Sequence, residues 1–215
     1  MREQGSLAVI GLGYIGLPTA VVLAQNGWKV TGVDVSDRTL EFVNAGRLPF
    51  VEEGLESALK EVVDSDALVA QKETPASDVY IISVPTPFKG DHEADLSYID
   101  AAIDKIIPQL QGDELVVLES TSPPLTTERM AERVFAARPD LKREGEGACH
   151  VCPCPGTSFA RAHHDRDDGQ RSHYRWAHSR SNAEGEGSLR HVLRWARSHY
   201  RCEDGGTCQA GRELF

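Results

Sequence analysis

The sequence has no run of about 18 or more apolar residues, so no segment has the length and hydrophobicity of a transmembrane helix. Its first residues lack the charged region, the apolar run and the small-residue cleavage site of a secretory signal peptide, and we therefore expect a cytoplasmic protein. The net charge of −10 at pH 7 argues against nucleic acid as a partner, because a polyanion would be repelled.

Several residue types are missing from one part or the other of the 215-residue chain. Residues 1–145 contain no cysteine, whereas residues 146–215 contain all five cysteines and seven of the eight histidines but no lysine, isoleucine or methionine. One domain rarely changes composition so abruptly, so we predict a folded domain over residues 1–145 and an aberrant tail over residues 146–215 that forms no domain. The tail is rich in Arg, His, Ser and Gly without a sustained hydrophobic period, which is typical of disorder.

Short apolar runs alternate with segments of helical spacing in the first 145 residues. The runs have the length and residue types of buried parallel strands, and they are residues 7–10, 29–34, 79–84 and 114–118. The segments with helical spacing are residues 14–26, 37–45, 53–63, 97–108 and 125–137. This alternation predicts an α/β fold with a Rossmann-like, doubly wound parallel sheet, in which ligands bind at the C-terminal ends of the strands.

Polar and glycine residues mark the ends of three predicted helices. Asn26-Gly27 is typical of a helix C-terminus, and we expect it to end the first helix. Ser36 or Asp37 is expected to cap the second helix, and Ser97 the helix over residues 97–108.

A glycine motif, Gly11-Leu12-Gly13-Tyr14-Ile15-Gly16, follows the first predicted strand and opens the first helix. In a dinucleotide site of this pattern, the first glycine permits a tight turn, the second leaves room for the pyrophosphate, and the third lets the helix pack closely on the strand. The free N–H groups of the helix N-terminus then face the phosphates. The alternative is that the glycines only serve the tight turn.

An acid at the end of the second predicted strand strengthens the prediction of a dinucleotide site. Asp34 is placed where a carboxylate binds both ribose hydroxyls and repels a 2′-phosphate, which favours NAD over NADP. Arg38 follows on the next helix and is a candidate for contact with a phosphate, which leaves the choice between the two cofactors partly open.

Two further polar clusters follow predicted strands. Val84-Pro85-Thr86-Pro87 either only terminates its strand or forms a rigid loop whose Thr86 faces the cofactor. In the second cluster, residues 119–124, Thr121 either donates a hydrogen bond to the cofactor or to a catalytic water, or caps the next helix. The spacing does not decide between these alternatives.

Three segments together resemble the UDP-glucose/GDP-mannose dehydrogenases, a family of nucleotide-sugar dehydrogenases. They are IGLGYIGLPTA at 10–20, VPTPFKGDHEADLSYID at 84–100 and LESTSPP at 118–124. The stretch PFKGDHE at 87–93 points to the UDP-N-acetylmannosamine branch, and the resemblance covers residues 6 to about 141 in order. One departure is Leu125, where many relatives carry glycine after the proline pair.

The resemblance implies an NAD-dependent oxidation of the C6 alcohol of a UDP-sugar to a carboxylate, in two hydride transfers. It implies that the residues that contact NAD are Tyr14, Ile15, Asp34, Thr86 and Thr121, and that Thr121 also lies near the catalytic water. It implies a homodimer built around a long central helix.

The rest of the family's machinery is a glutamate in a Pro-Glu-Arg motif, a lysine, and a cysteine nucleophile in a Gly-Gly-His-Cys motif. The sequence contains none of these motifs, nor the segments expected for the dimer helix and the UDP-sugar domain. We therefore expect this chain to be the cofactor half of such an enzyme and to be inactive in the reaction.

We hypothesise that the tail after about residue 150 is translated out of frame. If the last two bases of each codon are read with the first base of the next, codons 155–164 can spell PERVLPGRIM, codons 170–180 NDPTIGGLTPE and codons 200–215 TDAKMVELVKLVENSF. All three resemble family segments, in family order. Trp176 has a single codon, and before Ala177 it forces the shifted codon GGG, which is glycine, where the family has glycine.

The competing interpretation is a stand-alone NAD-binding module with a metal-binding tail. Cysteine and histidine are the usual ligands of structural zinc. The available residues are Cys149, Cys152, Cys154, His163, His164, Cys202 and Cys208. Against this interpretation, the second cysteine pair is widely spaced and no periodic strands or helices surround it.

Overall fold

The structure is a computed structural model that describes residues 5–52, 54–90, 93–145 and 147–153, and the backbone of residues 200–203 and 207–210. The elements in chain order are β1 (Ser6–Ile10), α1 (Gly16–Gln25), β2 (Lys29–Val33), α2 (Asp37–Asn44), α3 (Leu55–Asp64), β3 (Leu68–Gln71), β4 (Val79–Ile82), β5 (Phe88–Lys89), β6 (Glu93–Ala94), α4 (Ser97–Ile106), the 3₁₀ helix η1 (Ile107–Gln109), β7 (Leu115–Leu118), α5 (Thr126–Ala137), β8 (His150–Pro153), β9 (Tyr200–Glu203) and β10 (Thr207–Ala210). Among the described residues, no helix is both long and apolar enough to cross a membrane.

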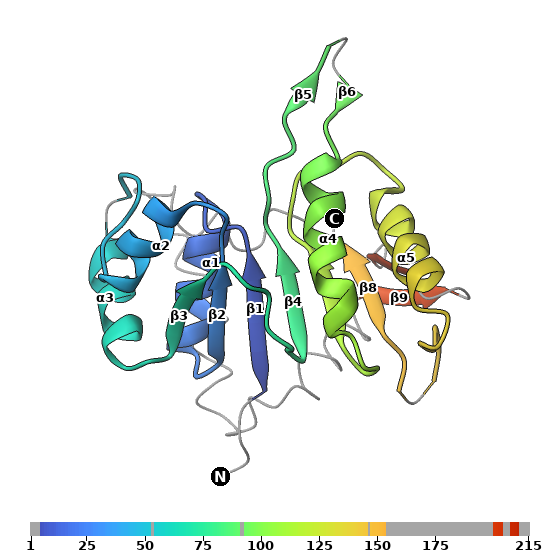
Figure 1. The fold of residues 1–215 in the computed structure, drawn as a ribbon, viewed down its shortest axis with the longest axis horizontal. Helices are drawn as coiled ribbons and strands as arrows, with labels where there is room; N and C mark the ends of the chain where they lie inside the picture. Colours follow the sequence, from blue (N-terminus) through green and yellow to red (C-terminus); the bar gives the residue numbers. More distant parts are fainter. Residues whose placement is uncertain are drawn as a thin grey trace, which may run out of the picture.

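Eight of the described strands form one sheet in the order β3-β2-β1-β4-β7-β8-β10-β9, which is parallel from β3 to β10 (Figure 1). Strands β2 and β3 follow one another on one side of β1, and the next strand in the chain, β4, lies on the other side of β1. The order therefore reverses between β1 and β4, and a crevice for ligands is expected at the C-terminal ends of these two strands. Within this sheet β9 runs antiparallel to its neighbour, β10, and β5 and β6 form a separate antiparallel pair.

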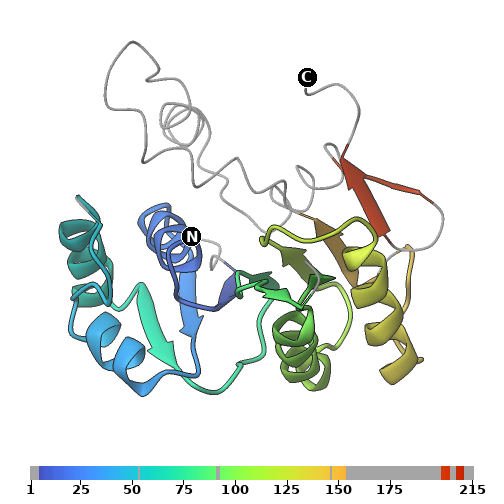
Figure 2. The ribbon, with the colours of Figure 1, turned by 90° about the horizontal axis from the view of Figure 1, so that it is seen from above.

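Helices cover both faces of the sheet, as the view from above shows (Figure 2). The alternation within each strand explains this, because successive residues point to opposite faces. In β1, Leu7 and Val9 pack against α1 and α3, whereas Ala8 and Ile10 pack against α4 and α5. The two apolar clusters on either side of the sheet make up the core.

The prediction of a Rossmann-like, doubly wound α/β fold is confirmed. Every predicted strand and helix is present, and the ends of two helices are as expected. Gly27 adopts φ +89° just after α1, and the Ser36 hydroxyl accepts the Thr39 N–H at the start of α2. The predicted cap at Ser97 is wrong, because Ser97 is already the first residue of α4 and its N–H is bound by Asp95 at 2.9 Å.

The predicted domain boundary at residue 145 comes before the last part of the parallel sheet. Strand β8 pairs along its whole length with β7, with Leu115 opposite His150 and Leu118 opposite Pro153. Val151 and Cys152 are buried on opposite faces. The folded unit thus continues at least to Pro153, and the sequence reasoning missed β8, β9, β10, the edge strand β3 and the small β5–β6 arm.

Residues 154–199, 204–206 and 211–215, which make up most of the tail, lie outside the described residues. The prediction of disorder there and the ligands Cys154, His163 and His164 therefore stay predictions.

Candidate functional site

The glycine motif lies at the C-terminal end of β1, and two of its glycines are required by packing. Gly11 has φ +97°, and a Cβ there would lie 2.7 Å from the Ser83 carbonyl oxygen. A Cβ on Gly16 would lie 1.9 Å from the Gly11 carbonyl oxygen, so the first turn of α1 packs directly on the loop. Both positions exclude any side chain for reasons internal to the fold.

Gly13 differs from the other two glycines. A Cβ on Gly13 would meet no atom within 4 Å, and its backbone does not have a positive φ. The folded chain alone therefore gives no reason for glycine here. A Cβ would enter the open space in front of the loop, which is the space that a dinucleotide pyrophosphate needs.

The loop also leaves backbone donors for an anion. Leu17 and Thr19 donate their N–H groups to the Gly13 and Ile15 carbonyls, which starts α1. Within the described part of the chain, the N–H groups of Tyr14 and Ile15 have no acceptor. Together with the positive end of the helix dipole, these groups suit a phosphate.

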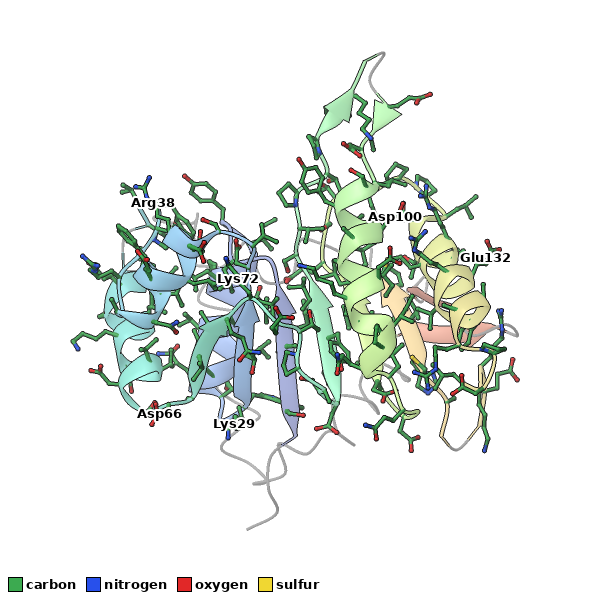
Figure 3. The ribbon with its side chains drawn as sticks, viewed as in Figure 1. Lys29, Arg38, Asp66, Lys72, Asp100 and Glu132 are labelled. Carbon is green, nitrogen blue, oxygen red and sulfur yellow. The ribbon has the colours of Figure 1, made fainter. Side chains whose placement is uncertain are left out.

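Asp34 faces this loop from the end of β2. Its carboxylate accepts the N–H groups of Leu12 and Ser36, both at 2.9 Å, so it is oriented toward the glycine motif. The exposed Arg38 lies at the same C-terminal edge, whereas Lys29 and Asp66 lie at the opposite edge (Figure 3). The Arg38 guanidinium is 5.5 Å from the centre of the Phe42 ring.

The aromatic ring of Tyr14 borders the site. Tyr14 is 70% exposed, and its ring centre lies 4.3 Å from that of Phe50.

A separate cavity of about 360 Å³ lies beyond the end of β2. It is lined by Val35, Lys72, Thr74 and Lys105, among other residues.

The two polar clusters after β4 and β7 are joined to each other. The Thr86 hydroxyl donates to the Thr121 carbonyl at 2.6 Å, and the Ser120 hydroxyl donates to the Val84 carbonyl at 2.8 Å. The alternative that Thr121 caps the next helix is wrong, because α5 begins at Thr126 with Leu125 in the capping position. The Thr121 side chain is exposed at the C-terminal edge of the sheet.

Leu125 adopts a left-handed backbone conformation with φ +69°. This conformation is unfavourable for a residue with a Cβ and natural for glycine. The departure from glycine at this position therefore places a strained residue directly after the proline pair, with its side chain 72% exposed.

Sequence reasoning missed one buried acid beneath the glycine motif. Glu119 is only 3% exposed, and its carboxyl oxygens accept the Thr19 hydroxyl at 3.1 Å and the Ser83 hydroxyl at 2.9 Å. Burial raises the pKa of this carboxyl above its usual range, and the two hydroxyl donors only partly oppose the shift. Glutamate is rarely buried, so no pattern in the sequence marks this residue.

The proposed zinc ligands Cys149 and Cys152 do not form a metal knuckle. Both are buried, Cys149 in the apolar cluster on the α4 and α5 face and Cys152 in the cluster on the α1 face. Because the sheet separates them, they cannot bind one ion. Burial also raises the pKa of the Cys149 thiol to about 12, which keeps it neutral.

Residues 5–160 match the model of the UDP-glucose/GDP-mannose dehydrogenase family, NAD-binding domain. The chain belongs to this family. The match includes β8 and extends past the predicted boundary at residue 145.

Relatives and solved structures agree with this assignment. The chain is 45% identical over 154 residues to UDP-N-acetyl-D-mannosamine dehydrogenase of Yersinia pestis, which covers 70% of this chain and 37% of the relative. It is 43% identical, again over 70% of the chain, to NDP-N-acetyl-D-galactosaminuronic acid dehydrogenase of Ralstonia nicotianae. The structure of the UDP-N-acetyl-mannosamine dehydrogenase of Staphylococcus aureus superposes with a TM-score of 0.65 at 35% identity, over 70% of this chain and 36% of that one. The chain therefore spans little more than a third of the length of these proteins.

Proposed function

We propose that this chain binds NAD across the C-terminal ends of β1, β2 and β4, with the pyrophosphate against residues 11–16. The observation that carries this proposal is Gly13, whose missing side chain serves no purpose within the fold but leaves room in front of the loop. The unpaired N–H groups of Tyr14 and Ile15 then bind phosphate oxygens. Asp34 binds the adenosine ribose hydroxyls, which favours NAD over NADP.

The remaining cofactor contacts are assigned to the edge of the site. Arg38 is placed beside the adenosine end of the dinucleotide. Thr86 and Thr121 lie on the two joined loops beyond β4 and β7, where the nicotinamide half would reach, and Thr121 is the candidate for orienting a catalytic water.

The reaction of the intact protein is proposed from its relatives. Bound NAD supplies the hydride acceptor for the oxidation of the C6 alcohol of a UDP-sugar, most simply UDP-N-acetylmannosamine, to the carboxylate. We propose that the intact protein is a cytoplasmic homodimer. This chain lacks the cysteine, lysine and glutamate motifs of the family, and we propose that it binds the cofactor without catalysing the oxidation.

We propose that the frame change lies after Pro153, a position supported by the pairing of β8 with β7 along its whole length. Resequencing of the DNA across codons 145–156 tests this placement. A second reading frame that spells Pro-Glu-Arg from codon 155 is expected, and an unambiguous sequence without it would remove the explanation.

Calorimetric titration with NAD tests the cofactor site directly. We expect saturable binding to the purified chain and at least tenfold weaker binding by Asp34→Ala, since hydrogen bonds to a charged group typically contribute about 1.5–3 kcal/mol. Asp37→Ala is the matched control, because this substitution removes the same charge near the same strand ends. The Asp37 carboxylate pairs with Lys72 at 2.6 Å and is not assigned to the cofactor. Equal affinities of the two variants would contradict the assignment of Asp34.

A further inference from the structure

Three positions that adjoin one another in the sheet meet beneath the first turn of α1. The strand pairs Ile10–Ile82 and Ile82–Leu118 are in register, and the next residues along each strand are Gly11, Ser83 and Glu119. The ladder continues through them, because Ser83 donates its N–H to Ile10 at 2.8 Å and Glu119 donates its N–H to Ile82 at 2.8 Å. The ends of β1, β4 and β7 are therefore held side by side at the switch point.

The Glu119 side chain connects these strand ends to the helix. One carboxyl oxygen accepts the hydroxyl of Thr19 from α1, and the other accepts the hydroxyl of Ser83 from the end of β4. Thr19 itself donates its N–H to Ile15, which belongs to the glycine motif. One side chain thus joins three segments that have to keep a fixed relation for the loop to accept a phosphate.

Ser83 is also the contact on which the glycines depend. A Cβ on Gly11 would lie 2.7 Å from the Ser83 carbonyl oxygen, and a Cβ on Gly16 would lie 3.0 Å from the Ser83 Cβ. A displacement of Ser83 as a whole therefore moves the surface against which both glycines pack. The hydrogen bond from its hydroxyl to Glu119 restrains such a displacement.

The interior position is costly for a carboxyl group. No Lys or Arg within the described ranges pairs with Glu119, and a buried acid whose only partners are hydroxyls is less favourable than an apolar side chain of similar size. Residues that lower stability in this way are commonly retained for function.

We propose that Glu119 is a positioning residue for the dinucleotide site, which holds α1 and the end of β4 so that residues 11–16 keep their phosphate-binding geometry. The proposal rests on the proposed binding of NAD at this loop. Glu119 acts through Thr19 and Ser83 and does not touch the cofactor.

Glu114, which precedes β7 as Glu119 follows it, provides a matched control. It is also buried, at 6% exposure, and it accepts two backbone N–H groups, from Gln111 and Gly112. It lies just before β7, at the edge of the sheet opposite the glycine motif. We expect the loss of its carboxyl to lower the stability of the fold without altering the cofactor loop.

The test measures hydrogen exchange of the backbone over residues 11–20 and the dissociation constant of NADH by fluorescence. For Glu119→Ala we expect exchange in this segment and the dissociation constant both to rise by about tenfold or more, because two hydrogen bonds to a buried carboxyl are lost. In Glu119→Gln, the amide oxygen still accepts one hydroxyl and the amide N–H donates to the other hydroxyl. We therefore expect the exchange rate and the dissociation constant of this variant to be close to those of the unaltered chain. Glu114→Ala is expected to change neither.

Three results would overturn the proposal: no change in Glu119→Ala, an equal change in Glu114→Ala, or no rescue by Glu119→Gln. If Glu119→Ala does not fold, Ser83→Ala removes one of the two hydroxyl donors and is expected to shift both readouts in the same direction by less. If the unaltered chain does not bind NADH, the proposed function fails, and the exchange measurement alone still decides the role of Glu119.

Discussion

At the N-terminal ends of the parallel strands, two carboxylates, Asp78 and Glu114, are paired inside the protein, whereas at the C-terminal ends the chain keeps donors and space for another molecule. Asp78 accepts both the N–H and the hydroxyl of Ser6 at the first edge, and Glu114 accepts two backbone N–H groups. At the second edge, the N–H groups of Tyr14 and Ile15 have no partner among the described residues. The same strands thus have one edge that serves stability and one that serves binding.

The largest expected effect is on stability and concerns the glycine motif. It distinguishes Gly16, which packing requires, from Gly13, which we assign to binding. Gly16→Ala places a Cβ 1.9 Å from a backbone oxygen that cannot move without displacing α1. We expect a loss of about 3 kcal/mol or more in the free energy of unfolding, as for severe overpacking, measured by urea denaturation. The same substitution at Gly13 serves as control, and a stability equal to that of the unaltered chain is expected there.

At the N-terminal edge, Asp78→Ala is expected to lower stability and leave binding intact. The change removes two hydrogen bonds to a charged group, at 2.7 and 2.9 Å, and a loss of about 2 kcal/mol follows. Urea denaturation and NADH titration of the same samples measure both quantities. Weaker NADH binding by the folded variant would contradict the assignment of stability to the N-terminal ends of the strands and of binding to their C-terminal ends.

Most of the fold was predictable because its central strands are continuous apolar runs. The missed strands lack that signal. Strand β3, Leu-Val-Ala-Gln, lies at the edge with Val69 exposed, and β8, His-Val-Cys-Pro, falls in the region where composition has already changed.

The candidate site was predictable only where it depends on local sequence. The spacing of Gly11, Gly13 and Gly16 and the acid at Asp34 indicated the cofactor loop without any tertiary information. The bond from Thr86 to Thr121 and the burial of Glu119 depend on how separate strands end beside one another, which no local pattern encodes.

A smaller effect is expected from pH. Burial raises the pKa of Cys149 from 9.0 to about 12, so the folded chain holds this proton more tightly than the unfolded chain does. Its contribution to stability is complete below about pH 9 and is lost as the pH rises toward 12. Between pH 8 and 10.5 we expect the unaltered chain to lose about 1–2 kcal/mol more than Cys149→Ala, by urea denaturation at each pH. Equal losses would show that the thiol is not buried in solution.

The smallest effect is a gain. Leu125→Gly removes the strain of a left-handed residue with φ +69°, and its exposed side chain contributes little packing. We expect the free energy of unfolding to rise by about 0.5–1 kcal/mol. Leu125→Ala keeps the Cβ and is expected to give no such gain, and a gain of the same size with alanine would contradict the role of backbone strain.

The central claim is that the space in front of Gly13 is kept for the pyrophosphate of NAD. NADH titration of the unaltered chain and of Gly13→Val, together with the unfolding midpoint of each, tests it most directly. The account predicts that Gly13→Val folds as stably as the unaltered chain, because a Cβ at this position meets no atom within 4 Å, and binds NADH at least about tenfold more weakly. Equal binding by both folded chains would contradict it.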